Sequence, residues 1–528
     1  MTPGPAGMPE DGVVDTSPNR LLLRGGSVYS PAHPHATALA VASGAVVWVG
    51  DDAGSGHYAE DADQVVELDG ALVTPAFVDA HAHLAQTGQA LISLDLSTAR
   101  SLVEALDALE GFARGGAGLL VGFGWDETRW PERRHPTMAE IDRAVGDRPA
   151  YLARVDVHSA VVSSALVARL PQLDGRDGWD GAGRVERDAH HVVRGAVQSM
   201  VSPAERRSAI ERALGQAASL GIGAVHELGA PHLSLPADFA QIRDLRGVPE
   251  VLGYWAALGD TDTAAELGCL GSAGDLCADG AIGSRTAAMA SPYADADTNG
   301  HRYLDVEDVT DHVVACTRAG LQAGFHCIGD DAVSTVIDGF RRAADVVGRE
   351  ALVAARHRLE HVEMIDAAGI ATMAALGIVA SVQPMFDARW GAAGGLYDER
   401  LGSRHAAMNP FGSLARAGVV LALGSDTPVT PFDPWGAVRA ARWHHDPEER
   451  ISVPAAFAAH TRGGWQAARR DEEGVLAPSR PATFAVWDVP GGSGVPQLPL
   501  LDPDEEPPGC LRTYLRGELI HQARGADE

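Results

Sequence analysis

The sequence predicts an α/β protein: a (β/α)8 TIM-like barrel with a small β domain built from both chain ends and an insertion after the first barrel strand. Short apolar segments of the kind that are buried in parallel sheets occur eight times, and segments with helical spacing separate them. The length, 528 residues, accommodates one large α/β domain with additions.

The two ends of the chain differ in texture from its middle. Residues 1–19 are rich in Pro, Gly and Asp and are expected to form a disordered tail. Short β segments bounded by Gly or Asp turns fill residues 20–73, and two more follow a helical piece within residues 446–528. We expect these parts to join into a composite β domain, which leaves residues 74–445 for the barrel.

Within the barrel region, strand-like and helical segments alternate, except in a stretch from about residue 86 to 200, which we interpret as the insertion. One connecting helix is well marked, because Ser202 and Glu205 form a capping box around Pro203, and Gly221 closes the far end. The predicted strands occupy residues 73–84, 221–229, 250–256, 274–281, 324–330, 358–364, 378–385 and 419–426.

Composition excludes several classes of function. Asp and Glu number 71 against 42 Lys and Arg, a formal charge of −29, which disfavours nucleic acid or anionic lipid as a partner. All basic side chains are Arg, so no Schiff-base or carboxylated lysine can exist. No apolar run reaches the roughly eighteen residues of a membrane span, and the five cysteines contain no CxxC pair. We expect a cytoplasmic protein with a small-molecule substrate and no membrane partner.

Histidines stand at the ends of predicted strands. His81 and His83 end the first strand, His326 the fifth, His361 follows Glu360 in the sixth, and Asp426 ends the eighth. The C-terminal ends of barrel strands converge on one mouth, so these side chains should meet there. Imidazoles with a carboxylate suit a divalent metal, with Zn²⁺ the leading candidate, in one or two ions. Such an ion lowers the pKa of a bound water to about 7.

Each of these residues has a simpler interpretation when taken alone. An HxH pair is usually a coincidence, His361 could be a hydrogen-bonded core residue, and Asp426 could cap a helix. Their common position at strand ends favours the metal site. The pairs His190/His191 and His444/His445 lie in polar contexts, and we interpret them as surface residues.

Six segments in order, FVDAHAHL, DGAIGSRTA, FHCIGDDAV, RLEHVE, SVQPM and LGSDTPV, resemble the motifs of the amidohydrolase superfamily. More narrowly, they resemble its branch of metal-dependent amidohydrolases that includes N-substituted formamide deformylase. The resemblance extends from about Leu21 to the C-terminus. It implies His81 and His83 at a first metal position, His326 and His361 at a second, and Asp426 as metal ligand and proton shuttle.

One departure from the family pattern concerns a metal ligand. The branch usually carries a lysine, carboxylated to bridge two metals, four residues before the DG pair; Asp275 occupies that position here. Asp supplies a carboxylate several bonds closer to the backbone, so either the barrel pinches inward or the site is not bridged in the usual way. Glu227 and Asp279 are further carboxylates near the mouth, and Cys277 is interpreted as a structural thiol.

Residues that contact the substrate are predicted in the insertion and at the strand ends. The resemblance places the segment of Arg154 and His158 near the barrel mouth, where the His158 imidazole could bind a carbonyl or an oxyanion, unless it is structural. Trp125, Arg285 and Gln383 are candidates for substrate binding.

These observations together predict a metal-dependent hydrolase that cleaves a non-peptide, amide-like C–N bond with metal-activated water, Asp426 moving the proton. Deamination or ester hydrolysis at the same site is one alternative. A catalytically decayed barrel that has lost the bridging lysine is another. A homodimer is expected, as is common in this family.

Overall fold

Eight parallel strands form the centre of the molecule. The computed structural model describes residues 20–116, 118–489 and 497–524, so the tail predicted at residues 1–19 lies outside the described part. The strands are arranged in two sheets, ordered β14-β13-β7 and β15-β16-β17-β18-β19. Their bounds are β7 Phe77–Ala82, β13 Ile222–Gly229, β14 Glu250–Trp255, β15 Gly271–Ser272, β16 Gln322–Cys327, β17 Arg358–His361, β18 Val379–Val382 and β19 Leu421–Leu423.

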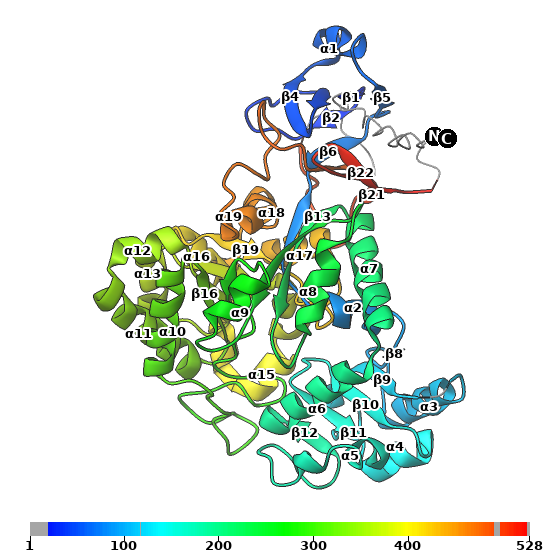
Figure 1. The fold of residues 1–528 in the computed structure, drawn as a ribbon, viewed down its shortest axis with the longest axis vertical. Coiled ribbons are helices and arrows are strands. Elements are labelled where there is room, and N and C mark those ends of the chain that lie inside the picture. The colour runs from blue at the N-terminus through cyan, green and yellow to red at the C-terminus, as the bar shows by residue number, and fades with distance from the viewer. Residues whose placement is uncertain (1–19, 117, 490–496, 525–528) are drawn as a thin grey trace, which may run out of the picture.

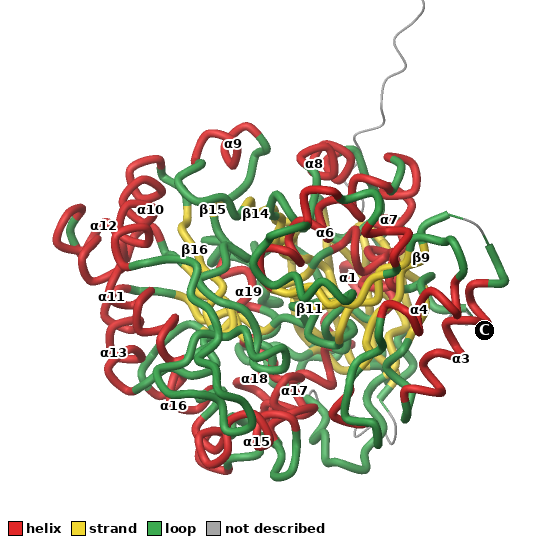
Figure 2. Tube along the Cα trace, turned by 90° about the horizontal axis from the view of Figure 1, so that it is seen from below, coloured by secondary structure: helices red, strands yellow, loops and turns green. Residues whose placement is uncertain are grey.

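The edges of these two sheets lie against each other. β14 contacts β15, and β19 contacts β7, where Ala82 and Thr427 form an isolated parallel bridge. All pairings inside the two sheets are parallel. Seen from below, the strands occupy the middle and helices surround them (Figure 2). The C-terminal ends of the eight strands therefore face one side, as the sequence predicts.

The helix predicted after Ser202 is confirmed. α7 spans Pro203–Ser219, and Ser202 and Glu205 form the reciprocal capping box, worth about 1 kcal/mol of helix stability. The helices associated with the eight strands have these bounds: α2 Leu84–Ala90, α8 Pro236–Arg243, α9 Thr261–Glu266, α10 Val306–Ala319, α11 Asp330–Val347, α12 Arg349–Ala355, α13 Ala367–Leu376, α14 Pro384–Phe386, α15 Leu396–Leu401, α16 Phe411–Arg416, α17 Pro434–Arg442, α18 Val453–Ala459 and α19 Arg462–Ala467.

The stretch that interrupts the strand–helix alternation forms a sheet of its own, ordered β12-β11-β10-β9-β8, beside the main strands (Figure 1). Its strands are β8 Leu94–Asp95, β9 Leu120–Trp125, β10 Ala150–Arg154, β11 Ser159–Val162 and β12 Arg184–Glu186. Its helices are α3 Leu102–Ala113, α4 Met138–Val145, α5 Ser164–Val167 and α6 Arg187–Met200.

Two further sheets lie at the top of Figure 1, ordered β4-β3-β1-β5 and β2-β6-β20-β21-β22. The second of them contains strands from both chain ends, joined where β6 pairs antiparallel with β20. α18 and α19, the helical piece that precedes β20, contact β19, and α19 also contacts β7. The bounds are β1 Arg20–Arg24, β2 Ser27–Val28, β3 Ala38–Ala42, β4 Ala45–Gly50, α1 Asp52–Ala59, β5 Gln64–Glu67, β6 Leu72–Pro75, β20 Phe484–Asp488, β21 Gly509–Leu515 and β22 Glu518–Gln522.

The fourth barrel strand is shorter than predicted, since β15 contains only Gly271 and Ser272 rather than residues 274–281. Ser272 pairs with Ala323 of β16, and Cys277 forms the next parallel bridge, with His326. Four residues thus lie between the two bridges on this segment, where β16 has two. Gly274, with φ +96°, lies in this bulge, which pushes the chain out of the strand.

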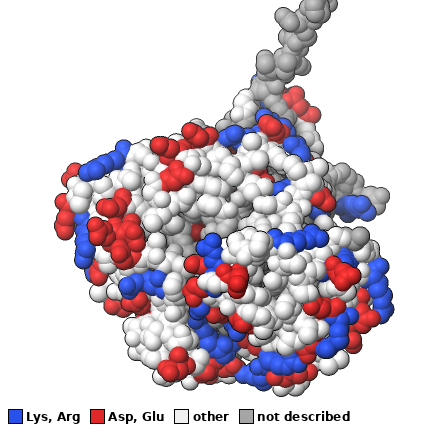
Figure 3. Space-filling model, turned by 60° about the horizontal axis from the view of Figure 1, so that its bottom comes forward, with Lys and Arg blue, Asp and Glu red and all other residues white. Residues whose placement is uncertain are grey.

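Among the described helices, none combines the length and apolar character needed to cross a bilayer. On the face seen in Figure 3, acidic and basic side chains lie side by side. The basic side chains therefore form no single basic surface on this face, in line with the net charge of −29.

Candidate metal centre

The first strand delivers two imidazoles in a fixed orientation. His81 lies in β7 and His83 directly follows it, and both side chains are buried. His81 Nδ1 donates to Glu360 Oε2 at 3.0 Å, and His83 Nδ1 donates to the Leu228 carbonyl at 3.0 Å. Each ring therefore presents Nε2 to the centre, the arrangement in which an outer partner fixes the tautomer of a metal-binding histidine.

The other two predicted histidines are held in the same way. His326 Nε2 donates to the Gly280 carbonyl at 3.2 Å, which leaves Nδ1 facing Asp275 Oδ1 at 3.8 Å. His361 Nδ1 donates to Gln383 Oε1 at 2.8 Å. Gln383, predicted to bind substrate, thus contacts a histidine of the site. The rings of His326 and His361 pack edge to face, with centroids 4.5 Å apart.

Asp275 and Asp426 lie between the first two histidines. Asp426 Oδ1 is 3.3 Å from His81 Nε2 and 3.2 Å from His83 Nε2. Asp275 Oδ1 is 3.4 Å from His81 Nε2, and its Oδ2 is 3.2 Å from His83 Nε2. The Asp275 carboxylate therefore reaches both histidines in spite of its short side chain, and its backbone lies in the bulge after β15.

These spacings fit a cation. Zinc bonds of about 2.0–2.1 Å place neighbouring tetrahedral ligands about 3.4 Å apart, longer than a good N–H···O hydrogen bond. His81 Nε2 and Asp275 Oδ1 are buried and have no hydrogen bond within the described part of the chain. The ligand atoms of His81, His83 and Asp426 lie within 4.8 Å of one another, as do those of His81, Asp275 and His361. The donor set accommodates a divalent metal.

The pKa values of the site show strong coupling between its charges. Burial opposes protonation of His81 and His83, but Asp275 and Asp426 raise the pKa of His81 well above its usual value and that of His83 to about 9. Against the effect of burial, His81 lowers the pKa of both carboxyls well below their usual range. Without a metal, the two carboxylates hold protons on the histidines in its place.

A buried ion pair holds Glu360, the hydrogen-bond acceptor of His81, in place. Arg358 Nε donates to Glu360 Oε1 at 2.6 Å, and its guanidinium lies 4.5 Å from the Tyr254 ring centre. Burial would raise the pKa of Glu360, but Arg358 lowers it to about 2, so the acceptor of the His81 proton stays charged. Sequence reasoning missed this role of Glu360, although its place directly before His361 in the sixth motif was the available signal.

Two further carboxylates that were candidates near the mouth serve backbone amides. Glu227 accepts from the Leu84 amide at 2.7 Å, and burial raises its pKa to about 7. Asp279 accepts from the Ile328 and Gly329 amides at 3.0 and 2.8 Å. Both therefore hold loops beside the histidines.

Backbone strain is concentrated at the same strand ends. His361, Val362 and Asp426 have φ values of +69°, +51° and +54°. A left-handed conformation is unusual for any of these residues and an outlier for a β-branched one such as Val362. Such strain is kept where surrounding contacts enforce it, typically at functional sites.

A small cavity of about 20 Å³, room for about one water, lies beside His326 and His361. The ring of His158 lies 5.0 Å from that of His326, and burial, together with His326, lowers its pKa well below the usual value. Glu363 also lines the cavity; its Oε2 has no hydrogen-bond partner among the described residues, and burial raises its pKa to about 8. The apolar part of the wall consists of Ala281, Ile282, Ile328, Phe386, Trp390, Leu396, Tyr397 and Val429.

Trp125 and Arg285 line a different, arginine-rich cavity. The Trp125 indole donates to the Leu152 carbonyl at 2.8 Å, and Arg285 pairs with Asp295. Arg154 lines it too and pairs with Asp156, whose carboxylate also accepts from the His158 amide. Substrate contact through Trp125 or Arg285 stays a prediction and would be made at this second cavity.

The interpretation of the paired histidines as surface residues is wrong for two of them. His190 is buried on the face of α6 that also carries Val193 and Val197, and its Nε2 lies 2.8 Å from the Tyr151 hydroxyl. His444 is buried beside Asp387. Polar neighbours in the sequence hid the helical spacing that turns His190 inward.

Comparison with known proteins gives consistent matches along most of the chain. A family model described as "Amidohydrolase family" matches residues 64–521. The Arabidopsis thaliana protein LONG AFTER FAR-RED 3 is 28% identical over 526 residues, covering 89% of this chain and 88% of the relative. N-substituted formamide deformylase of Arthrobacter pascens is 26% identical over 536 residues, covering 93% and 96%. The structure of an uncharacterized metal-dependent hydrolase from Pyrococcus furiosus matches with a TM-score of 0.70 and 26% identity, over 88% of this chain and 98% of that one.

Proposed function

Because the chain belongs to the amidohydrolase family, whose members include metal-dependent hydrolases, we propose that it hydrolyses a non-peptide, amide-like C–N bond of a small molecule. The observation that carries this proposal is the orientation of the four histidines. Each has one ring nitrogen bound to an outer acceptor, and three turn the other toward Asp275 or Asp426.

We assign His81, His83, Asp426 and Asp275 to a first cation, with zinc the best fit to this nitrogen and oxygen set. His326 and His361 would share Asp275 with a second cation. Two close cations would need an anionic ligand between them, and Asp275 would be that ligand where the family resemblance implies a carboxylated lysine. A bound cation supplies a Lewis acid and a water whose pKa is lowered to about 7.

Asp426 is the proton carrier in this proposal. Its Oδ1 faces His81 and His83, while its backbone amide donates to the His81 carbonyl at 2.8 Å, which fixes the position of the carboxylate. It takes a proton from water and returns it to the leaving nitrogen, as C–N cleavage requires. The neutral imidazole of His158 is placed to donate to the substrate oxygen as negative charge develops on it.

The cavity beside the histidines suggests the substrate. Much of its wall is apolar and aromatic, and its polar lining includes Asp156, His158, Glu363 and Asp426. We expect a small amide with an apolar substituent on nitrogen to pack against the apolar side chains, with its polar part toward Glu363, once these side chains move apart to admit it. The name of the Arthrobacter relative, N-substituted formamide deformylase, supports the same class.

A substrate screen tests this function. Zinc-loaded protein is offered N-formyl and N-acyl amides with aromatic or alkyl substituents, and amine release is measured beside the Asp426→Asn variant. We expect turnover by the parent chain only. Faster release of ammonia from amino-substituted rings would identify a deaminase, and faster ester cleavage an esterase. A chain that binds no metal and turns over none of the three would be a decayed member.

The larger architecture belongs to the same proposal. Contacts of β14 with β15 and of β19 with β7 support a continuous (β/α)8 barrel, and the β6–β20 pairing supports a composite β domain. A homodimer stays a prediction, and light scattering at micromolar concentration would test it.

A further inference from the structure

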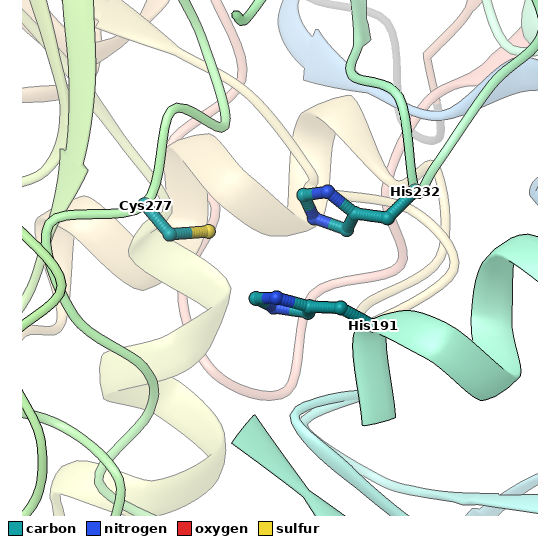
Figure 4. A group of neighbouring side chains, drawn as sticks. All are labelled: His191, His232 and Cys277. Carbon is teal, nitrogen blue, oxygen red and sulfur yellow. The ribbon is translucent and has the colours of Figure 1, made fainter. Parts of the chain in front are cut away.

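A second group of soft metal ligands lies outside the proposed catalytic set. His191 on α6, His232 in the loop between β13 and α8, and Cys277 in the bulge after β15 have donor atoms within 4.8 Å of one another. The three residues come from segments far apart in the sequence. In Figure 4 the two imidazoles stack and the Cys277 sulfur points toward them.

The ring nitrogens of both imidazoles have no hydrogen-bond partner among the described residues. The rings of His191 and His232 stack, with centroids 4.3 Å apart. All three side chains are partly exposed, so an ion can enter from solvent. Burial, followed by Arg194, lowers the pKa of His191 to about 4, so this ring is neutral and offers a lone pair at pH 7.

We propose that His191, His232 and Cys277 bind a zinc-type divalent cation, distinct from the cations assigned to the proposed hydrolytic site. Two imidazoles and one thiolate are a ligand set of tetrahedral zinc with one position left open. Binding releases the Cys277 proton to solvent. Ligand pairs on zinc lie about 3.5 Å apart, so any pair wider than that, up to the 4.8 Å limit, would close in on binding. Within the described residues, the Cys277 thiol makes one weak hydrogen bond, 3.5 Å to the Asp275 carbonyl, which leaves the side chain free to adjust.

Local charge permits the ion. The positive charge of Arg194 acts on all three residues, and its guanidinium donates to Gln86 Oε1 at 3.1 Å and to the Val157 carbonyl at 3.5 Å. Asp275, two residues from Cys277, acts on His232 in the opposite sense. The bound ion would tie the insertion, through α6, to the segment that carries Asp275.

Cobalt provides a test with a readout independent of catalysis. The proposed hydrolytic site offers only nitrogen and oxygen, so a near-ultraviolet thiolate-to-cobalt charge-transfer band in Co²⁺-loaded protein must come from a cysteine. We expect this band in the parent chain and its loss in Cys277→Ser. The matched control Cys510→Ser, a partly buried thiol in β21, should keep it. His191→Ala should weaken Co²⁺ affinity at this site by about 100-fold or more. This loss exceeds the roughly 10–100-fold that follows when a metal ligand loses only its outer hydrogen-bond partner.

Metal counting separates this proposal from the proposed function. Zinc measured by mass spectrometry should fall by one equivalent in Cys277→Ser, while His81→Ala should lower the count and leave the cobalt–thiolate band. A parent chain without the band, or a Cys277→Ser variant that keeps both the band and its full zinc count, would overturn the proposal, whatever the hydrolytic activity.

Discussion

The first and fourth strands bring their candidate ligands to the same centre in different ways. β7 is a continuous strand that carries His81, with His83 directly after it, and an outer acceptor holds each ring. Its pairing with β13 shifts register at two points, but the alternation of the strand still places both side chains on one side. The fourth strand breaks after Ser272, and Asp275 lies in the bulge that follows. We expect this bulge to make up for the shorter side chain, because a displaced backbone can replace the missing methylenes.

The largest expected effect comes from Asp426, beside the end of β7. Asp426→Asn should lower kcat by about a thousandfold, because the amide cannot take up the proton that C–N cleavage must deliver. Stopped assays on zinc-loaded protein would measure the effect, with Asp338→Asn on the exposed face of α11 as the control. An Asp426→Asn variant with unchanged kcat would remove Asp426 from the chemistry.

The outer contact of His81 should matter less. Glu360→Gln keeps the shape of the side chain but weakens the acceptor that orients His81 Nδ1, and it should weaken zinc affinity by about 10–100-fold. Competition with a chromophoric chelator measures the affinity. Glu350→Gln in α12 controls for the loss of one acidic charge. Equal affinities in the two variants would show that His81 needs no such support.

The bulge itself can be tested through Gly274. An added Cβ would meet Leu228 Cβ at 3.0 Å, and φ is +96°, so Gly274→Ala should cost about 1–3 kcal/mol and shift Asp275. Gly418→Ala is the matched control, with φ +81° and no atom within 4 Å of its Cβ. Thermal unfolding should show a loss in both variants, but only Gly274→Ala should lose zinc affinity. Unchanged affinity there would mean that the bulge does not position Asp275.

The smallest expected effect is a pH dependence of the metal-free protein. The pKa of His83 is raised to about 9 in the folded state, so its stabilising proton is fully present below the ordinary value near 6.5 and is lost as pH rises through about 9. The Tm of chelated protein should therefore fall between pH 6.5 and 9, while zinc-loaded protein, whose His83 carries no proton, should not show this loss. Parallel curves for both forms would contradict the assignment of His83.

The sequence predicted the parts of the site that follow from strand periodicity and motif order. His81, His83, His326, His361 and Asp426 all stand at strand ends, which a pattern of short apolar segments locates. It did not predict the break at Gly274. The two extra residues there are recognised only by comparing this segment with its partner strand β16, and the sequence does not give that register.

Contacts between segments far apart in the sequence were also beyond prediction. Trp125 was predicted to bind substrate, and the sequence did not show that it lines a cavity separate from the one beside His326 and His361. His191 was interpreted as a surface residue from its polar sequence context, which does not reveal that His232 and Cys277, from other segments, lie beside it. No local pattern records which loop will face which helix.

The central claim is that Asp275 takes the place of a carboxylated lysine as a metal ligand. The most direct measurement is the zinc content of Asp275→Ala and of the isosteric Asp275→Asn, each purified without added bicarbonate and compared with the parent chain. We expect the parent chain to bind its full complement of zinc without bicarbonate, and both variants to remain folded and lose at least one equivalent. Full zinc content in a folded Asp275→Ala variant would contradict it.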